Sequence, residues 1–195
     1  MRRIVATLVV VGALLFSAGS AWADFFYGWA AYERGDYVTA LKEWRPLAEQ
    51  GDAATQHNLG LMYANGEGVP ENDVKAVEWY SKAAKQGFAA AQYNLGLKYD
   101  EGTGVPENDA EAVKWYRKAA EQGHAKAQNN LGLMYANGEG VPENDVEALK
   151  WYSLAKAQGF KIAADNLDII KKQMTPAQTA KAQELAAEWW EEHNN

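Results

Sequence analysis

The sequence predicts an all-α solenoid built from antiparallel helix pairs, and three observations support this prediction. One segment occurs three times with a period of 36 residues: it reads QHNLGLMYANGEGVPENDVKAVEWYSKAAKQG from Gln56, and close copies begin at Gln92 and Gln128. Within each copy the apolar residues follow helical spacing, with no strand pattern. A fixed period of this size is typical of units that are too small to fold alone and that stack into one continuous core.

Each unit is expected to hold two helices joined by a loop, as the unit 52–87 illustrates. Gly60 lies on the inner face of the first helix, where a small residue allows close approach of a neighbour. Gly66 follows at a position where a left-handed residue typically ends a helix. The stretch EGVPEN cannot continue a helix, because proline restricts itself and the residue before it. Asn72 or Asp73 can then cap a second helix through a side-chain oxygen.

Three tryptophans keep the register of the repeat. Trp79, Trp115 and Trp151 stand at the same position of successive units. A residue that stacking requires must recur in every unit, whereas a catalytic residue need occur only once. The tryptophan column is therefore expected to be structural.

The repeat resembles a known family through the pattern AxxNLGxxYxxGxGVPENDxxAxxWYxxAAxQG. This pattern is similar to that of the Sel-one-like repeats, which are relatives of the tetratricopeptide repeat, and it covers about 110 residues. The resemblance implies a right-handed superhelical solenoid that binds other proteins or assembles complexes.

The two ends deviate from the repeat. Residues 24–51 match a unit with a shortened loop, and Pro46 is expected to kink or split its second helix because it removes a backbone hydrogen bond. At the other end Asp168 occupies the glycine column, and a charged side chain there blocks close stacking. Thr175 and Gln178 form a capping box for a last helix, which we expect to cover the exposed end. The predicted domain is 24–195, with a shortened unit 24–51, full units 52–87, 88–123 and 124–159, and C-terminal capping helices in 160–195.

Residues 1–23 have the three parts of a secretory signal peptide: a basic start, a short apolar run and small residues before the cleavage site. The apolar run from Ile4 to Phe16 is too short for the roughly 20 residues that a membrane-spanning helix needs. We expect cleavage after Ala23 and export to the periplasm or the cell exterior, with no membrane anchor afterwards.

The charge and the residue types exclude several classes of function. Without residues 1–23 the chain has 17 basic and 26 acidic side chains, a balance of −9, which argues against nucleic acid and against anionic membranes. The chain has no cysteine, hence no disulfide framework and no thiolate nucleophile or ligand. His57, His124 and His193 are too scattered to suggest a metal site. We expect no catalytic residue, cofactor or metal.

Binding is the favoured function. In such superhelices the first helix of each pair usually lines the concave groove, and outward-facing columns that differ between units can carry specificity. An asparagine column is retained instead, and it either offers a polar ladder to a peptide or satisfies backbone groups within the stack. The varying columns are either a binding site or unconstrained surface. The candidate groove residues are His57, Asn58, Met62, Tyr93, Asn94, Lys98, Asn129, Asn130 and Met134.

The predicted partner is a protein or an extended peptide, bound by a monomeric, non-enzymatic scaffold. An alternative is an assembly or regulatory factor for envelope or polysaccharide machinery, because other exported members of the family scaffold such machinery. A hydrolase is the alternative from another class: some cysteine-rich secreted members have been associated with β-lactams, but this chain lacks their cysteines.

Overall fold

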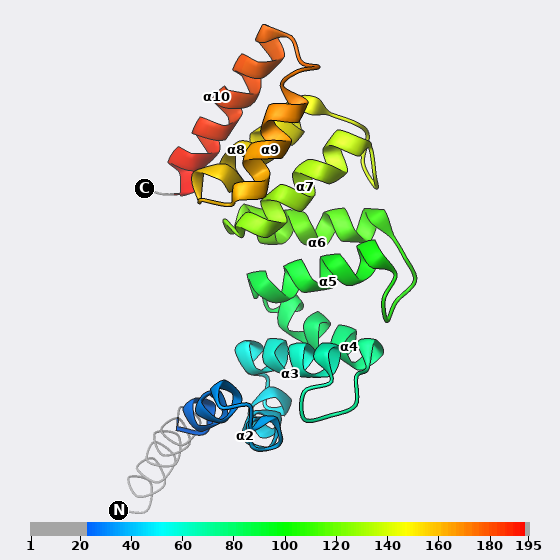
Figure 1. The fold of residues 1–195 in the computed structure, drawn as a ribbon, viewed down its shortest axis with the longest axis vertical. Coiled ribbons are helices and arrows are strands. Elements are labelled where there is room, and N and C mark those ends of the chain that lie inside the picture. Colours follow the sequence, from blue (N-terminus) through cyan, green and yellow to red (C-terminus); the bar gives the residue numbers. More distant parts are fainter. Residues whose placement is uncertain (1–22, 194–195) are drawn as a thin grey trace, which may run out of the picture. The chain divides into compact units, whose positions relative to one another are not determined.

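A computed structural model describes residues 23–193, and Figure 1 shows their helices. The described residues are helical or lie in turns and loops, with no strand among them. This confirms the all-α class. The predicted signal peptide falls, except for Ala23, on residues outside the described range. The helices are residues 23–33, α2 Tyr37–Glu49, α3 Ala53–Asn65, α4 Asp73–Lys85, α5 Ala89–Glu101, α6 Asp109–Glu121, α7 Ala125–Asn137, α8 Asp145–Ala157, α9 Lys161–Ile170 and α10 Pro176–His193.

The chain forms two compact units, Met1–Lys82 and Ala83–Asn195, and the division falls within α4. In the first unit, α2 packs against α3. In the second, α5 packs against α6, α7 against α8, and α8 against both α9 and α10. Within each unit these helices pack against neighbours in the sequence, as expected for a stack of helix pairs.

The repeated sequence sets where each helix begins and ends. Gly66, Gly102 and Gly138 follow α3, α5 and α7 with φ angles of 69°, 66° and 72°. These left-handed conformations favour glycine. The loops end at asparagines whose side-chain oxygens accept backbone N–H groups of α4, α6 and α8. The predicted helix boundaries are therefore confirmed, with asparagine as the capping residue.

A glycine of the first helix packs against a tyrosine of the second helix within each full pair. A Cβ added to Gly96 would lie 2.6 Å from the ring of Tyr116, and one added to Gly132 would lie 2.7 Å from the ring of Tyr152. Real Cβ atoms do not approach other atoms so closely, so the tyrosine ring occupies the space that any larger residue would need. This contact explains why the glycine and the tyrosine recur together.

Each compact unit has its own buried core. In the first unit, Trp44 packs with small and aliphatic residues of helix 23–33, α2 and α3. In the second, one cluster joins α6, α7, α8 and α10, and a smaller cluster joins α8, α9 and α10. Trp115 and Trp151 are buried and Trp79 is half-buried, which agrees with a structural role for this column.

The two ends differ from the expectation at one point. Helix α2 continues through Pro46 to Glu49, so of the two expected outcomes, a kink or a split, the split does not occur. Pro46 is exposed, and its carbonyl still accepts the N–H of Gln50 at 3.1 Å. The loss of one hydrogen bond on a solvent-facing side is small beside the burial of Trp44 and Ala48 on the inner face.

Helix α10 covers the last repeat, as predicted. Thr175 and Gln178 form the expected capping box: the backbone N–H of Thr175 donates to Gln178 Oε1 at 2.9 Å, and that of Gln178 donates to Thr175 Oγ1 at 3.3 Å. Ala182, Ala186 and Trp189 are buried, and the Trp189 ring packs edge-on against Trp151 at 6.3 Å. The end of the stack is thereby shielded from water.

Candidate peptide-binding face

The candidate site lies on the outer surface of the first helices. Within 23–193 no group of three or more His, Cys, Asp or Glu residues is arranged to hold a metal ion. Among those same residues no helix is both long and apolar enough to cross a membrane. What remains is the outer surface of the first helices.

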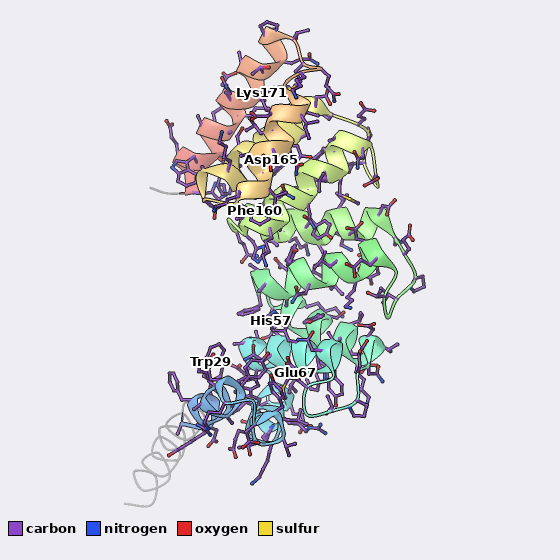
Figure 2. The ribbon with its side chains drawn as sticks, viewed as in Figure 1. Trp29, His57, Glu67, Phe160, Asp165 and Lys171 are labelled. Carbon is purple, nitrogen blue, oxygen red and sulfur yellow. The ribbon has the colours of Figure 1, made fainter. Side chains whose placement is uncertain are left out.

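In the second unit, three columns of the first helices face outward together, and we refer to them as the first-helix face. The columns are an asparagine column, an aliphatic column and a polar column, and all their members are half-buried or exposed. Figure 2 shows Phe160, Asp165 and Lys171 spaced along α9, one of the helices that carry this face. The members are Asn94, Leu97 and Glu101 of α5, Asn130, Leu133 and Asn137 of α7, and Asn166, Ile169 and Gln173 of α9 and the turn after it.

A pocket of about 420 Å³ opens in this face between α7 and α9. Its apolar walls come from both helices and from the second helix α8, and its polar rim includes Asn137, Asn166 and Glu143. The two most exposed apolar residues of the face, Leu133 and Ile169, both lie on its wall. The pocket therefore combines an apolar floor with amide groups at its edge, as small-ligand and side-chain sites commonly do.

The preceding pair has a hydrogen bond at the equivalent position. There Asp100 accepts a hydrogen bond from the Tyr116 hydroxyl at 2.8 Å. One period later Ala136 and Tyr152 occupy these places, and both line the pocket. Because alanine cannot reach the hydroxyl, Tyr152 has no hydrogen-bond partner among residues 23–193. The change from aspartate to alanine therefore removes a hydrogen bond beside the pocket.

Both tyrosines are neutral donors at physiological pH. Burial raises the pKa of Tyr116 well above its usual value, and the neighbouring Asp100 adds to this, while the Asn130 hydrogen bond acts in the opposite direction. Burial alone raises the pKa of Tyr152 to about 12. The Tyr152 hydroxyl is thus available to donate to an acceptor on a bound molecule.

A chain of side-chain hydrogen bonds runs beneath the first-helix face. Asn130 bonds the Tyr116 hydroxyl, and Asn129 Nδ2 approaches Asn130 Oδ1 at 3.4 Å. Asn166 Nδ2 then donates to Asn129 Oδ1 at 3.0 Å, which connects α9 to α7. The partners of Asn130 and Asn166 are side chains rather than backbone groups, so both interpretations of the asparagine column stay predictions.

The structure corrects the outward orientation expected for three candidate groove residues. Met62, Met134 and Asn129 are buried. Met62 packs with Trp44 and Leu59 in the core of the first unit, and Met134 lies in the main core of the second. The lysine in the same column, Lys98, is only half-buried. The aliphatic stem of Lys98 can pack where the methionine side chains pack, with its charged end in solvent. The change between methionine and lysine in this column therefore did not indicate a surface position.

The other candidates lie at the surface but also contact neighbouring elements. His57, Asn58, Asn94 and Lys98 are half-buried. The His57 ring lies 5.9 Å from the Tyr80 ring.

Tyr93 is also half-buried. It stacks on His124 at 4.8 Å and lies 6.0 Å from Tyr116. This column therefore lies at the boundary between surface and core, and its role in binding stays a prediction.

Sequence reasoning missed two features of the stack. The first is a set of buried glutamines: the side-chain amides of Gln56, Gln92 and Gln128 donate to carbonyls near the end of the preceding second helix at 2.9–3.1 Å. The side-chain oxygens of Gln92 and Gln128 also accept from Gln122 and Gln158. Their recurrence every 36 residues was the available signal. The second is the pocket itself, for which Ala136 in place of Asp100 was the signal.

Comparison with known proteins identifies the family. The Sel1 repeat matches residues 53–88, 89–124 and 125–160, together more than half of the chain. The crystal structure of a Sel1 repeat protein from Oxalobacter formigenes superposes with a TM-score of 0.73 and 39% identity, covering 85% of this chain and 68% of that one. The chain belongs to the Sel1 repeat family.

Further similarities concern parts of longer proteins. A protective antigen of uropathogenic Escherichia coli with an SLR fold matches with a TM-score of 0.63 and 31% identity, over 91% of this chain and 47% of that one. Two proteins named exopolysaccharide production negative regulator also match. The one from Rhizobium meliloti (strain 1021) is 37% identical over 71 residues, and the one from Rhizobium leguminosarum bv. viciae is 36% identical over 58 residues. These matches cover 36% and 30% of this chain but only 26% and 22% of the regulators.

Proposed function

We propose that this chain is a non-enzymatic binding protein whose first-helix face holds an extended segment of a partner protein. The observation that carries the proposal is the open pocket between α7 and α9, with exposed Leu133 and Ile169 on its wall. Exposed aliphatic side chains beside a concave pocket mark interaction sites more often than isolated ones do.

The lining suggests how a peptide would bind. An apolar side chain of the partner would enter the pocket and contact Leu133, Ile169 and Ile170. A peptide carbonyl would accept the Tyr152 hydroxyl proton, and the amides of Asn137 and Asn166 would pair with the backbone on either side. Glu143 at the rim and the acidic balance of the chain favour a neutral or basic segment.

Site-specific crosslinking tests this proposal. A benzophenone amino acid in place of Gln173, at the edge of the pocket, should capture a discrete partner from an envelope extract. Ile169→Glu should remove the capture, because a carboxylate would point into the apolar pocket. Ile162→Glu is the matched control: it changes the same residue type on the same helix at nearly equal exposure, 58% against 61%, outside the pocket. Equal capture by the two variants would overturn the proposed site.

A role in envelope or polysaccharide regulation is the second candidate, and the likeness to the two exopolysaccharide regulators favours it. We propose that the chain is exported after cleavage following Ala23 and acts there as a monomer. Deleting its gene should change the amount of secreted polysaccharide, measured as hexose per cell mass. Mass spectrometry of the exported protein should give Asp24 as the first residue, whereas a mass starting at Met1 would contradict the export.

The hydrolase alternative receives no support from the described residues. The purified protein should not turn over a chromogenic β-lactam above the rate of buffer alone. Turnover that follows the protein through size-exclusion chromatography would contradict the non-enzymatic assignment.

A further inference from the structure

A second pocket lies at the C-terminal ends of α6, α8 and α10, away from the lining of the first one. Its volume is about 300 Å³. The second helices and α10 provide its walls, so it does not depend on the proposed peptide site. The lining residues that matter for its chemistry are Glu121, Gln122, Gln158, Trp189, Trp190 and His193.

The polar groups of this pocket are fixed by the stack. The side-chain amide nitrogen of Gln122 donates to Gln92 Oε1 at 2.6 Å, and that of Gln158 donates to Gln128 Oε1 at 2.7 Å. Anchored in this way, each glutamine keeps its own Oε1 as an acceptor for which no donor is found among residues 23–193. The Glu121 carboxylate is a further acceptor.

The aromatic groups of the pocket have distinct surroundings. The His193 ring stacks on Trp189 at 4.1 Å, and Trp151 packs edge-on against the same indole. Trp189 is more than nine-tenths buried, and its indole N–H has no acceptor among the described residues. This nitrogen is shielded from solvent, so the polar atoms that the pocket offers are the oxygens of Glu121, Gln122 and Gln158. Trp190, which is 40% exposed, offers an indole surface to the same pocket.

We propose that this pocket binds one sugar unit of a neutral glycan. A pyranose ring has an apolar C–H face for an indole and carries hydroxyl groups that both donate and accept. The hydroxyls would donate to Glu121 and to the glutamine oxygens. An anionic sugar is disfavoured by Glu121. An ammonium group would also suit Glu121 and the indole of Trp190, so a cation enters the test as the competing ligand.

Binding of defined oligosaccharides to the purified full chain tests the proposal. The probes are the tetrasaccharides of glucose and of N-acetylglucosamine, followed by saturation-transfer NMR and titration calorimetry, with choline as a cationic probe. At least one tetrasaccharide should bind, and Trp190→Ala should weaken its binding about tenfold, the effect expected when an aromatic contact of about 1.4 kcal/mol is lost. Trp29→Ala is the matched control, because Trp29 is 45% exposed on helix 23–33 of the first unit (Figure 2), and it should leave the affinity unchanged.

The remaining outcomes each decide the question. Binding of choline with no saccharide signal would overturn the ligand class, and equal weakening by Trp190→Ala and Trp29→Ala would overturn the location. If Trp190→Ala alters the melting temperature, Gln158→Leu replaces it and should also weaken saccharide binding. Ile169→Glu should leave saccharide binding intact, so failure here is distinguishable from failure of the peptide site.

Discussion

The pairs α5/α6 and α7/α8 are successive copies of one sequence unit, yet they differ in the residue that faces the tyrosine hydroxyl. Both have the glycine–tyrosine contact, the left-handed glycine after the first helix and the asparagine cap of the second. In the first copy Asp100 binds the Tyr116 hydroxyl, whereas in the second Ala136 leaves Tyr152 beside an opening. The two copies therefore differ in whether this tyrosine hydroxyl has a protein partner among residues 23–193.

The largest expected effect is the loss of stability on removing the repeated tryptophan, which should be similar in the two copies. Trp115→Ala and Trp151→Ala should each lower the free energy of unfolding by about 3–5 kcal/mol, since both indoles are buried. Urea denaturation followed by circular dichroism measures this. A cost below about 1 kcal/mol for one but not the other would show that the copies differ in their cores and not only at the pocket.

A smaller effect is expected at the glycines. Gly96→Ala and Gly132→Ala should each destabilise by about 1–3 kcal/mol, because the added Cβ collides with a tyrosine ring. The cost should be greater at Gly96, where Asp100 fixes the ring of Tyr116, than at Gly132, where the Tyr152 ring can shift toward the pocket. Thermal melts of the two variants compare them directly, and the reverse order would contradict the tethering role of Asp100.

Removing the tyrosine hydroxyl should change the stability of the two copies by different amounts. Tyr116→Phe should cost about 1–1.5 kcal/mol because Asp100 and Asn130 lose their shared partner. Tyr152→Phe should change stability by less than about 0.5 kcal/mol, since no protein partner is lost among residues 23–193. Equal costs in chemical denaturation would mean that the two hydroxyls have equivalent surroundings.

The smallest expected effect is a pH dependence of stability that comes from His124, which occurs in one repeat alone. His124 Nδ1 accepts the N–H of Ala127 at 3.2 Å, which requires an unprotonated nitrogen. Burial, with help from Lys126, lowers the pKa of His124 below its usual 6.5. Its contribution to stability is therefore full above about pH 6.5 and is lost as the pH falls through that value toward the lower folded pKa.

The repeat itself supplies the control for this effect. Phe88 and Phe160 occupy the same column as His124, so the His124→Phe variant should fold. Its melting temperature should fall less between pH 7.5 and pH 5 than that of the natural chain. Identical pH profiles would assign the acid sensitivity to other groups.

The helices and their ends were predictable because local chemistry sets them. Gly66 ends α3, Asn72 caps α4, and Thr175 begins α10 with its capping box. Each of these signals involves residues close together in sequence, so the spacing alone identifies it.

The orientation of the columns was less predictable because it depends on how neighbouring helices rotate against each other. Met134 was expected at the surface and is buried, whereas Leu133, the residue before it, is exposed. Adjacent residues on a helix point about 100° apart, so a small rotation exchanges their environments. The pocket was also missed, since it arises from a missing side chain at Ala136 rather than from a motif.

The central claim is that the opening at Ala136 is the site where a partner's side chain binds, and Ala136→Asp tests it most directly. This variant places in α7 the carboxylate that Asp100 supplies in α5, so it should bind the Tyr152 hydroxyl and close the pocket. Crosslink yield from the benzophenone at position 173 should then fall at least about tenfold, a loss of about 1.4 kcal/mol or more, with the melting temperature unchanged or raised. A yield equal to that of the unsubstituted chain, in a folded variant, would contradict the claim.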